Sequence, residues 1–371
     1  MKHFYLFLLI TVLGLPAFSQ NCTIILNRAE DDYEAGRLLG IPDRITPCLE
    51  NEAFSKEEEI RALKLMTLVF IFTDNDSKAD EYLVKLLKAD PEHDLDPEVD
   101  PAELYYLYNQ FRVKPIFRVA FRAGVNSSDP QIVNSFTSSD TNTWPKFTNG
   151  RTPGGLKTYT VEGSQPVAAI NGIGLGTFLE LMIERHLLKG IEVAGGPQLR
   201  ISSYNVDMYL NNSSMYSEIV EKQTYLRLPV LARYNLWYED EPRKDILPYA
   251  YIGGSFDYLL NSTVSDGART GGTSFSLVEN NDYKANDMVY NTNVSIFGGL
   301  GAKFRMATHF LTLEFRYDRS FGLYHNPENR WNNNQNSTFD LAYVPDDTKL
   351  HMFSFSVGYT RSIYNPKKLV E

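Results

Sequence analysis

From Ile116 onward the chain consists of eight runs in which apolar and polar residues alternate. The runs span residues 116–126, 168–182, 189–206, 222–238, 247–262, 291–305, 309–323 and 349–364. Alternation with a period of two is typical of β-strands, because successive side chains point to opposite faces. A tilted strand needs about 9–11 residues to cross a bilayer, and each run is long enough. The pattern therefore predicts a sheet of eight long strands, either half-buried in a soluble protein or spanning a membrane.

The polar faces of the runs distinguish these two environments. In the first run Phe117, Val119 and Phe121 share one face, whereas Arg118 and Arg122 share the other. Across the runs the polar faces carry both signs of charge: Arg118, Arg122, Glu180, Glu192, Arg200, Arg227, Arg233, Lys303, Arg305, Glu314, Arg316 and Asp318. A transmembrane barrel encloses such residues, lets opposite charges pair, and turns the apolar face toward lipid. We therefore expect these residues to form a lumenal charge network.

Glycines also lie on the polar faces, at positions 172, 174, 176, 196, 299 and 301. Small residues there let a narrow wall curve, and we expect them to leave room for long arginine side chains. Since an eight-stranded barrel is just wide enough to be filled by its side chains, the charges are expected to form a plug rather than a pore. Anion binding by Arg118, Arg122, Arg227 and Arg233 is the alternative to their pairing with Glu180, Glu192 and Glu314.

The connections between the runs alternate between long and short. The long ones are polar and cover residues 127–167, 207–221, 263–290 and 324–348. The short ones include residues 184–188 and 306–309. Long outer loops and short periplasmic turns are the pattern of outer-membrane barrels. The first strand is then expected to run outward, which places both the segment before it and the tail, residues 365–371, in the periplasm.

The first residues predict export. In "MKHFYLFLLITVLGLPAFSQ", Lys2 and His3 precede an apolar core, which ends in Ala17-Phe18-Ser19. This is the pattern of a signal peptide, residues 1–19, with cleavage after Ser19. In an oxidising compartment Cys22 and Cys48, the only cysteines, are expected to form one disulfide. Closing that loop would stabilise the fold by about 3–4 kcal/mol.

Residues 20–112 have helical rather than alternating periodicity. A first helix is expected to stop at Gly40, with Pro42 beyond it, and Ser55 and Glu58 form a capping box before an apolar run. Asp100 is expected to cap a last helix, which Lys114-Pro115 ends. The sequence thus predicts a small helical domain ahead of a barrel over residues 113–364.

The helical domain partly resembles a tetratricopeptide repeat. Ala79, Leu83, Leu86 and Pro91 have the spacing of the second helix of that repeat. A plain four-helix packing is the alternative, and helical hairpins of either kind mostly bind other proteins.

Four runs carry a resemblance to a known family: "YLRLPVLARYNL" (Tyr225–Leu236), "PYAYIGGSFDYLL" (Pro248–Leu260), "IFGGLGAKF" (Ile296–Phe304) and "LTLEFRYDRSFG" (Leu311–Gly322). Over roughly residues 116–364 the chain resembles the PorT-like outer-membrane β-barrels of Bacteroidetes, some of which are implicated in type IX secretion and gliding. The resemblance implies an α + β chain, with the small α-helical domain added before an eight-stranded antiparallel transmembrane β-barrel.

The sequence contains no nucleophile elbow, phosphate loop or zinc motif. The net charge of −10 and the lack of a basic run argue against nucleic-acid binding. Residues 74–81 and 94–100 are acidic, but they lack the glycine of a calcium loop and are expected to be solvated loops between helices. The six histidines are scattered, with His186 and His309 expected in short turns and His325 in an outer loop. No catalytic, cofactor-binding or metal-binding residue is therefore assigned.

These features predict a non-enzymatic protein of the cell outer membrane. Its barrel would contact lipid and anchor the helical domain, which would dock a periplasmic or outer-membrane protein through residues 20–112. The complex would serve secretion, gliding or outer-membrane assembly, and no cofactor is expected. The alternatives are an outer-membrane enzyme with an active site at the barrel rim, and a soluble, secreted β-barrel that binds a small ligand.

Overall fold

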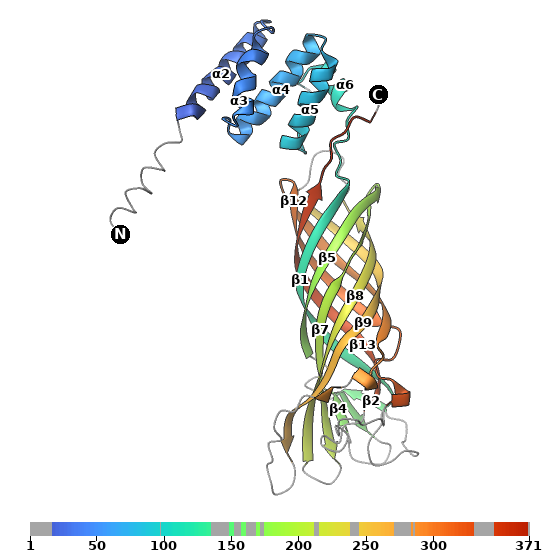
Figure 1. Cartoon of the computed structure of the whole chain (residues 1–371). Coiled ribbons are helices and arrows are strands. Elements are labelled where there is room, and N and C mark those ends of the chain that lie inside the picture. The colour runs from blue at the N-terminus through green and yellow to red at the C-terminus, as the bar shows by residue number, and fades with distance from the viewer. Residues whose placement is uncertain are drawn as a thin grey trace, which may run out of the picture. The chain divides into compact units, whose positions relative to one another are not determined.

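The computed structural model describes residues 17–96, 98–134, 148–151, 157–160, 168–170, 174–210, 215–237, 245–270, 283–284, 286–329 and 345–369. The chain forms two compact units (Figure 1). The helical unit combines residues up to Ile116 with those from Ile363 onward, and the barrel unit is Phe117–Ser362. Most of the expected signal peptide, residues 1–16, lies outside the described residues.

The helical unit contains five described helices: α2 (Ala17–Glu34), α3 (Ile41–Glu50), α4 (Lys56–Phe72), α5 (Asp76–Ala89) and α6 (Ala102–Tyr108). Their apolar faces meet in one core, in which Leu26, Ile45, Met66, Leu83 and Leu86 are fully buried. The predicted capping box is present at the start of α4. The Ser55 hydroxyl accepts from the Glu58 amide, and the Glu58 carboxylate accepts from the Ser55 amide.

The structure corrects three expectations about these helices. The first helix, α2, ends at Glu34 rather than at Gly40, and Gly40 is the N-cap of the next helix, α3. Pro42 lies in the first turn of α3, where its missing amide hydrogen costs the helix no hydrogen bond. The N-cap of α6 is Pro101, because the Asp100 carboxylate instead pairs with Lys64 and accepts from the Asp96 amide. The last helix ends at Tyr108, so Lys114-Pro115 does not terminate it.

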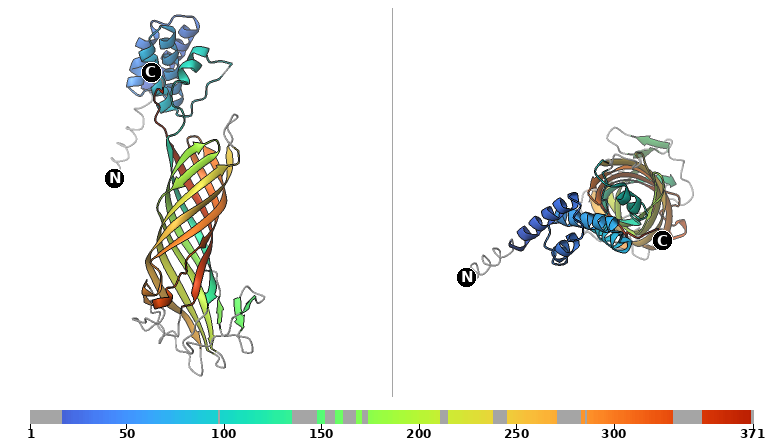
Figure 2. Two further views of the ribbon diagram at one scale, coloured as in Figure 1. Left: turned by 90° about the vertical axis from the view of Figure 1, so that its right-hand side faces the viewer. Right: turned by 90° about the horizontal axis from the view of Figure 1, so that it is seen from above.

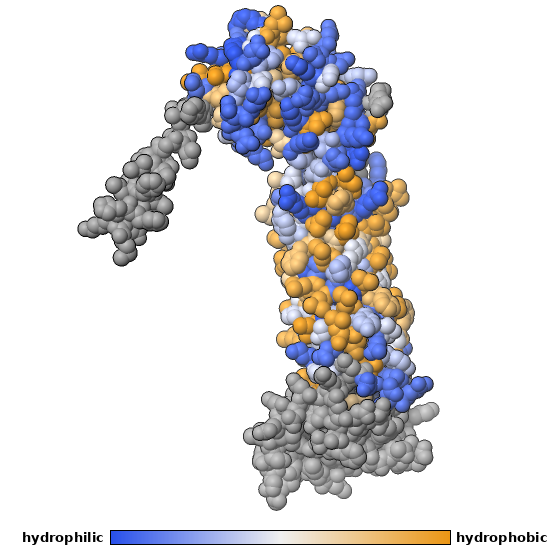
Figure 3. Space-filling model, in the orientation of Figure 1, coloured by the Kyte–Doolittle hydropathy of each residue, from blue (hydrophilic) through white to orange (hydrophobic). Residues whose placement is uncertain are grey.

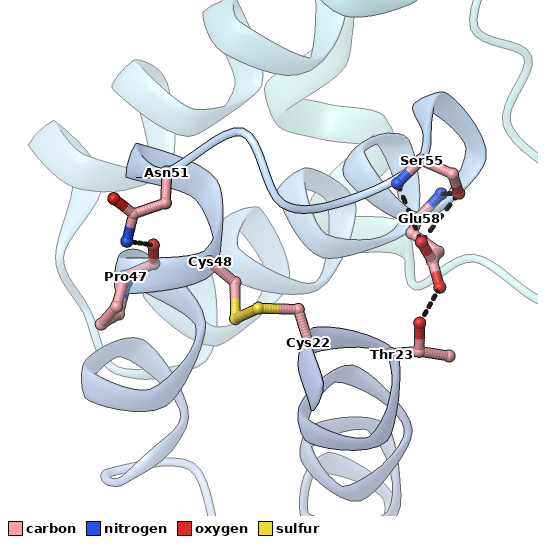
Figure 4. The surroundings of a disulfide bond; sticks show 7 residues. All are labelled: Cys22, Thr23, Pro47, Cys48, Asn51, Ser55 and Glu58. Atoms are coloured by element: carbon pink, nitrogen blue, oxygen red, sulfur yellow. Dashed lines mark hydrogen bonds between the residues drawn. A yellow bond between two sulfur atoms is a disulfide. The ribbon is translucent and has the colours of Figure 1, made fainter. Parts of the chain in front are cut away.

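A disulfide joins Cys22 of α2 to Cys48 of α3 (Figure 4). The next residue of α2, Thr23, donates a hydrogen bond from its hydroxyl to Glu58 at 2.6 Å, so α2 is also joined to the capping box of α4. The Thr23 hydrogen bond, followed by those from Ser55, lowers the pKa of the Glu58 carboxyl. The beginning of α2 is thus fixed by one covalent and one polar contact.

The segment that follows the last strand belongs to the helical unit. Lys368 forms an antiparallel bridge with Phe111, and its ammonium pairs with Asp80 of α5 at 2.7 Å. The Arg112 amide donates to the Lys367 carbonyl, and the Leu369 amide donates to the Gln110 carbonyl. Residues 367–369 therefore lie against residues 110–112, far away in the sequence.

The barrel unit is a closed antiparallel ring (Figure 2). Its strands are β1 (Phe117–Asn134), β5 (Gly174–Leu188), β6 (Ile191–Gly195) with β7 (Gln198–Leu210), β8 (Met215–Asn235), β9 (Ile246–Thr270), β11 (Thr292–Met306), β12 (His309–Ser320) and β13 (Asp347–Ile363). β6 and β7 are two parts of one strand, because both lie between β5 and β8. β13 pairs with β1, which closes the ring and confirms the predicted eight-stranded barrel.

Several strand limits differ from those expected. The second strand begins at Gly174 rather than at residue 168 and continues to Leu188, so the expected turn at 184–188 is wrong. The turn lies at Lys189-Gly190, where Gly190 has a φ of +75°. The expected long loop at 207–221 is mostly strand, because β7 and β8 pair up to Leu210 and Met215.

Short elements also lie inside the other three expected long loops, and β4 lies at the start of the expected second strand. β2 (Thr148–Arg151), β3 (Lys157–Thr160) and β4 (Ala168–Ile170) extend the sheet beyond β7. β10 (Tyr283–Lys284) pairs with the outer part of β9, which continues to Thr270. Two 3₁₀ turns are also present: η1 (Asn286–Met288) follows β10, and η2 (Pro327–Asn329) lies between β12 and β13. The barrel strands therefore extend well past the length that a bilayer requires.

The outer wall of the barrel is apolar along its middle. Val230, Ile252 and Leu300 expose 64%, 69% and 63% of their surface, and apolar side chains gather over the wall that Figure 3 shows. Exposed tyrosine and tryptophan side chains occur toward the two strand ends, at Tyr234, Trp237, Tyr258, Tyr290 and Tyr359, whereas exposed phenylalanines also lie along the middle of the wall. An apolar band with aromatic rims is the surface that a lipid bilayer selects. Among the described residues, no helix is long and apolar enough to cross a membrane.

Candidate functional site

The lumen of the barrel holds a continuous network of buried charges. Ten of the twelve charges assigned to it from the sequence are buried: Arg122, Glu180, Glu192, Arg200, Arg227, Arg233, Lys303, Glu314, Arg316 and Asp318. Arg118 and Arg305 are half-buried. Since buried charges are tolerated only when they are paired, the contacts among them decide what the lumen can do.

Arg122 lies at the centre of the network. Its guanidinium contacts Glu184 at 2.5 Å, Glu180 at 3.0 Å and Glu314 at 3.4 Å. On the other side of Glu180, Arg316 approaches the same carboxylate at 3.2 Å. These pairs join β1, β5 and β12, which are not all neighbours in the ring, so the contacts cross the lumen.

A second group lies closer to the short turns. Lys303 contacts Glu192 at 2.6 Å and Glu184 at 3.3 Å. Arg233 pairs with both of these carboxylates, at 3.1 and 3.0 Å, and Arg118 donates to Glu192 at 2.5 Å. Each of these two carboxylates therefore has at least three cationic partners, counting Arg122 for Glu184.

A third group lies toward the opposite end of the strands. Arg227 contacts Asp257 at 2.6 Å and Asp318 at 2.9 Å. Arg200 is fully buried but less well satisfied, since Asp318 lies 3.5 Å away without a hydrogen bond and the Met352 sulfur accepts a hydrogen bond from the guanidinium. Pairing of the lumenal arginines with carboxylates is thus what the structure shows for Arg118, Arg122, Arg227 and Arg233, the four arginines considered for anion binding.

Inward-facing glycines make room for aromatic rings. A Cβ atom on Gly299 would lie 2.6 Å from the Tyr251 hydroxyl oxygen, and one on Gly301 would lie 2.5 Å from the Tyr249 ring. The Tyr249 hydroxyl donates to Glu314 at 2.6 Å. These glycines accommodate tyrosines, not arginines as the sequence suggested, although Gly358 does lie against Arg122.

A separate buried cluster around His325 lies at the end of the barrel opposite the short turns. His325 is 3% exposed, and its Nε2 lies 3.2 Å from Glu221, which also accepts from the Tyr204 hydroxyl. Its Nδ1 lies 2.8 Å from the Asp346 carbonyl oxygen and 3.1 Å from the Thr348 hydroxyl. Because a carbonyl oxygen only accepts, Nδ1 carries hydrogen and cannot take a proton from the threonine. The group therefore connects chain segments and does not activate the hydroxyl as a nucleophile.

Several residues of the lumenal network and of the His325 cluster were not predicted from the sequence. Glu184 was expected in a turn, and His325 in a solvated loop. Asp257, Glu221, Tyr249 and Tyr251 were not singled out. A charged residue in phase with the polar face of a strand was the available signal for Glu184 and Asp257, while nothing local indicates the position of His325. His186 and His309 lie in β5 and β12 rather than in turns.

The helical unit carries the other candidate site, a cavity of about 500 Å³ lined by α3, α4 and α5. Leu49, Leu63, Tyr82 and Ala89 supply apolar surface, and charged side chains surround it.

Elsewhere on this unit Asp32 accepts hydrogen bonds from Arg44 and Arg37, which lower the pKa of its carboxyl. The Asp90 pKa is lowered mainly by the hydrogen bond from His93, at 3.0 Å. Across the described parts of the chain, no group of three or more His, Cys, Asp or Glu residues is arranged to hold a metal.

A closed antiparallel ring with an apolar wall and a charged interior is the architecture of outer-membrane β-barrels. Residues 108–326, more than half of the chain, match the family described as outer membrane protein beta-barrel domain. The chain belongs to this family, and it is a protein of the outer membrane. The alternative of a soluble, secreted barrel is therefore wrong.

Solved structures of outer-membrane proteins are similar in fold. OprG of Pseudomonas aeruginosa shares 10% identity at a TM-score of 0.30, covering 68% of this chain and 98% of that one. Neisserial surface protein A shares 10% identity at a TM-score of 0.29, and the match covers 67% of this chain and 97% of that one. The third structure is that of the Yersinia pestis attachment invasion locus protein Ail in complex with the heparin analogue sucrose octasulfate. It shares 9% identity at a TM-score of 0.28, and the match covers 66% of this chain and 99% of that one. No curated protein is significantly similar to the chain.

Proposed function

We propose that the barrel is a non-enzymatic anchor and that the helical unit faces the periplasm, where it docks a protein partner of an envelope complex. The observation that carries this proposal is the lumen. Charges from β1, β5, β8, β11 and β12 pair across it, so the interior is occupied by side chains that hold one another. Such an interior suits a structural support, and it leaves the helical unit as the part available to partners.

The positions of the strand ends support this orientation. The chain enters β1 and leaves β13 at the same end of the barrel as the short turns Lys189-Gly190 and Ala307-Thr308. In outer-membrane barrels the short turns face the periplasm. The disulfide Cys22–Cys48 fits that oxidising compartment.

The pathway is inferred from the resemblance to PorT-like barrels of Bacteroidetes. That resemblance supports a role in secretion, gliding or outer-membrane assembly. The partly tetratricopeptide-like hairpin α4–α5 supports protein docking, because such hairpins expose helix faces to partners.

Two measurements test the proposal on the full chain in native membranes. An epitope inserted at Gly36, in the turn after α2, should react with antibody only after the outer membrane is permeabilised. An epitope in the β7–β8 hairpin should react on intact cells. Chemical crosslinking followed by purification should recover a defined envelope protein with the full chain, and not with a variant lacking residues 20–107. Surface exposure of the Gly36 epitope would refute the orientation, and an identical set of crosslinked proteins for both variants would refute docking.

A further inference from the structure

The cavity of the helical unit lies between three consecutive helices. α3 contributes Leu49, α4 contributes Leu63, and α5 contributes Tyr82 and Ala89. Leu63 and Tyr82 are buried, and Leu49 and Ala89 are half-buried, so the inner surface is firmly packed. A volume of about 500 Å³ is within the range of natural ligand sites, and the inner surface suits one apolar side chain.

Charges of opposite sign stand on different helices around this inner surface. Lys85 and Lys88 belong to α5, whereas Glu50 belongs to α3 and Glu59 to α4. All four side chains are exposed. Within the described residues, Lys85 pairs with Glu81 at 2.7 Å, and no ion pair engages Lys88, Glu50 or Glu59. The cavity therefore offers Lys88 on one side and Glu50 and Glu59 on the other, none of them in an ion pair among the described residues, whereas Lys85 is shared with Glu81 and also interacts electrostatically with Glu50.

The frame of the cavity is fixed before any ligand arrives. Leu49 and Glu50 directly follow Cys48, whose disulfide to Cys22 holds α3 to α2. Below the cavity, the inner faces of α4 and α5 belong to the main core of the unit. A preformed site loses little entropy on binding, which favours recognition of a short, flexible ligand.

We propose that this cavity binds a short extended peptide segment of the protein partner. An apolar side chain of the segment packs on Leu49, Leu63 and Tyr82. An acidic side chain on one side of it pairs with Lys85 and Lys88, and a basic side chain on the other pairs with Glu50 and Glu59. Purely anionic ligands such as nucleotides are disfavoured by the two glutamates, whereas a peptide supplies both charges around an apolar residue. The inference rests on the proposed docking function and specifies its ligand.

The test uses the full chain in lipid nanodiscs and a random heptapeptide library displayed on phage. Enriched peptides should carry an apolar residue between an acidic and a basic one. Their affinity should fall about ten-fold or more in the double variant Lys85→Glu/Lys88→Glu, because charge-assisted contacts of that size are lost. Lys78→Glu is the matched control, since Lys78 is an exposed lysine of α5 outside the cavity and should leave affinity unchanged.

A charge swap makes the test specific. Selection against Lys85→Glu/Lys88→Glu should enrich peptides with a basic residue in place of the acidic one. Ala89→Trp, which fills the cavity and keeps its charges, should also abolish binding. Circular dichroism melting checks that each variant is folded.

Other outcomes would overturn the inference. These are the absence of enriched peptides, peptides that bind the double variant and Lys78→Glu equally, or binding that survives Ala89→Trp in the folded protein. The docking function fails separately, in the crosslinking experiment. If a partner is recovered there and the cavity variants do not affect it, docking stands and this peptide site is refuted.

Discussion

Removal of the Arg122 guanidinium should destabilise the barrel by a predictable amount. Arg122→Met keeps most of the side-chain volume but leaves Glu180, Glu184 and Glu314 without their shared cation. Removal of one partner of a buried ion pair lowers the free energy of unfolding by about 3–5 kcal/mol, because the other charge stays buried without its partner. Here each carboxylate keeps another cation, since Arg316 remains on Glu180 and Arg233 remains on the other two. We therefore expect a loss near the lower limit, about 3 kcal/mol.

The free energy of unfolding can be measured by urea titration of the barrel in lipid vesicles, with tryptophan fluorescence and heat-dependent gel mobility as readouts. Arg185→Met is the control, because Arg185 is exposed on β5, outside the network. It should change the free energy by less than about 1 kcal/mol.

A second substitution tests the electrostatic reasoning itself. Glu180→Gln alone loses its contacts with Arg122 and Arg316 and should also destabilise the barrel. Together with Arg122→Met it restores the charge balance, so the double variant should cost about 1–3 kcal/mol less than the sum of the single losses. Additive effects, or an Arg122→Met barrel as stable as the control, would refute the view that these buried charges support one another.

Three further predictions concern the wall and the helical unit. Val230→Arg, at the middle of the apolar stretch of β8, should cost about 2–4 kcal/mol in a bilayer and reduce the assembled fraction seen by gel mobility; normal assembly would contradict lipid contact there. Cys22→Ser with Cys48→Ser should lower the stability of the helical unit by about 3–4 kcal/mol in thermal melts under oxidising conditions, and not under reducing ones. Because the folded-state pKa values of Glu58 and Asp90 lie below their unfolded values, their stabilisation is complete above about pH 4.3 and is lost as the pH falls through the folded values. The melting temperature of this unit should therefore drop below that pH, and Glu58→Gln should weaken the dependence.

The sequence predicts the wall of the barrel well because lipid imposes a strict rule on it. Every second residue of a spanning strand faces hydrocarbon, so Phe353, Phe355 and Val357 can be assigned from their period alone, and the structure exposes all three. The limits of β5 are harder to predict. The apolar pair Leu187-Leu188 interrupts the alternation, and the actual turn depends on the positive φ of Gly190.

The partners inside the lumen could not be predicted from the pattern. Whether Arg122 meets Glu184 or Glu192 depends on the relative shift of the strands, which alternation leaves open. His325 and Glu221 are separated by 104 residues, and only the closed ring brings them together. In the helical unit, Pro42 gives the same local signal at the end of one helix as at the start of the next, so α3 was missed.

The pairing of residues 367–369 with residues 110–112 makes the helical unit discontinuous in sequence, with the whole barrel inserted within it. Synthesis runs from the N-terminus, so the Lys368–Asp80 pair can form only after the entire barrel sequence has been made. Helices α2 to α6 can pack earlier, but the β-bridge between Phe111 and Lys368 forms only after β13 has been made. Any partner that contacts this bridge would thereby distinguish a chain that contains the whole barrel from one truncated before the end of β13.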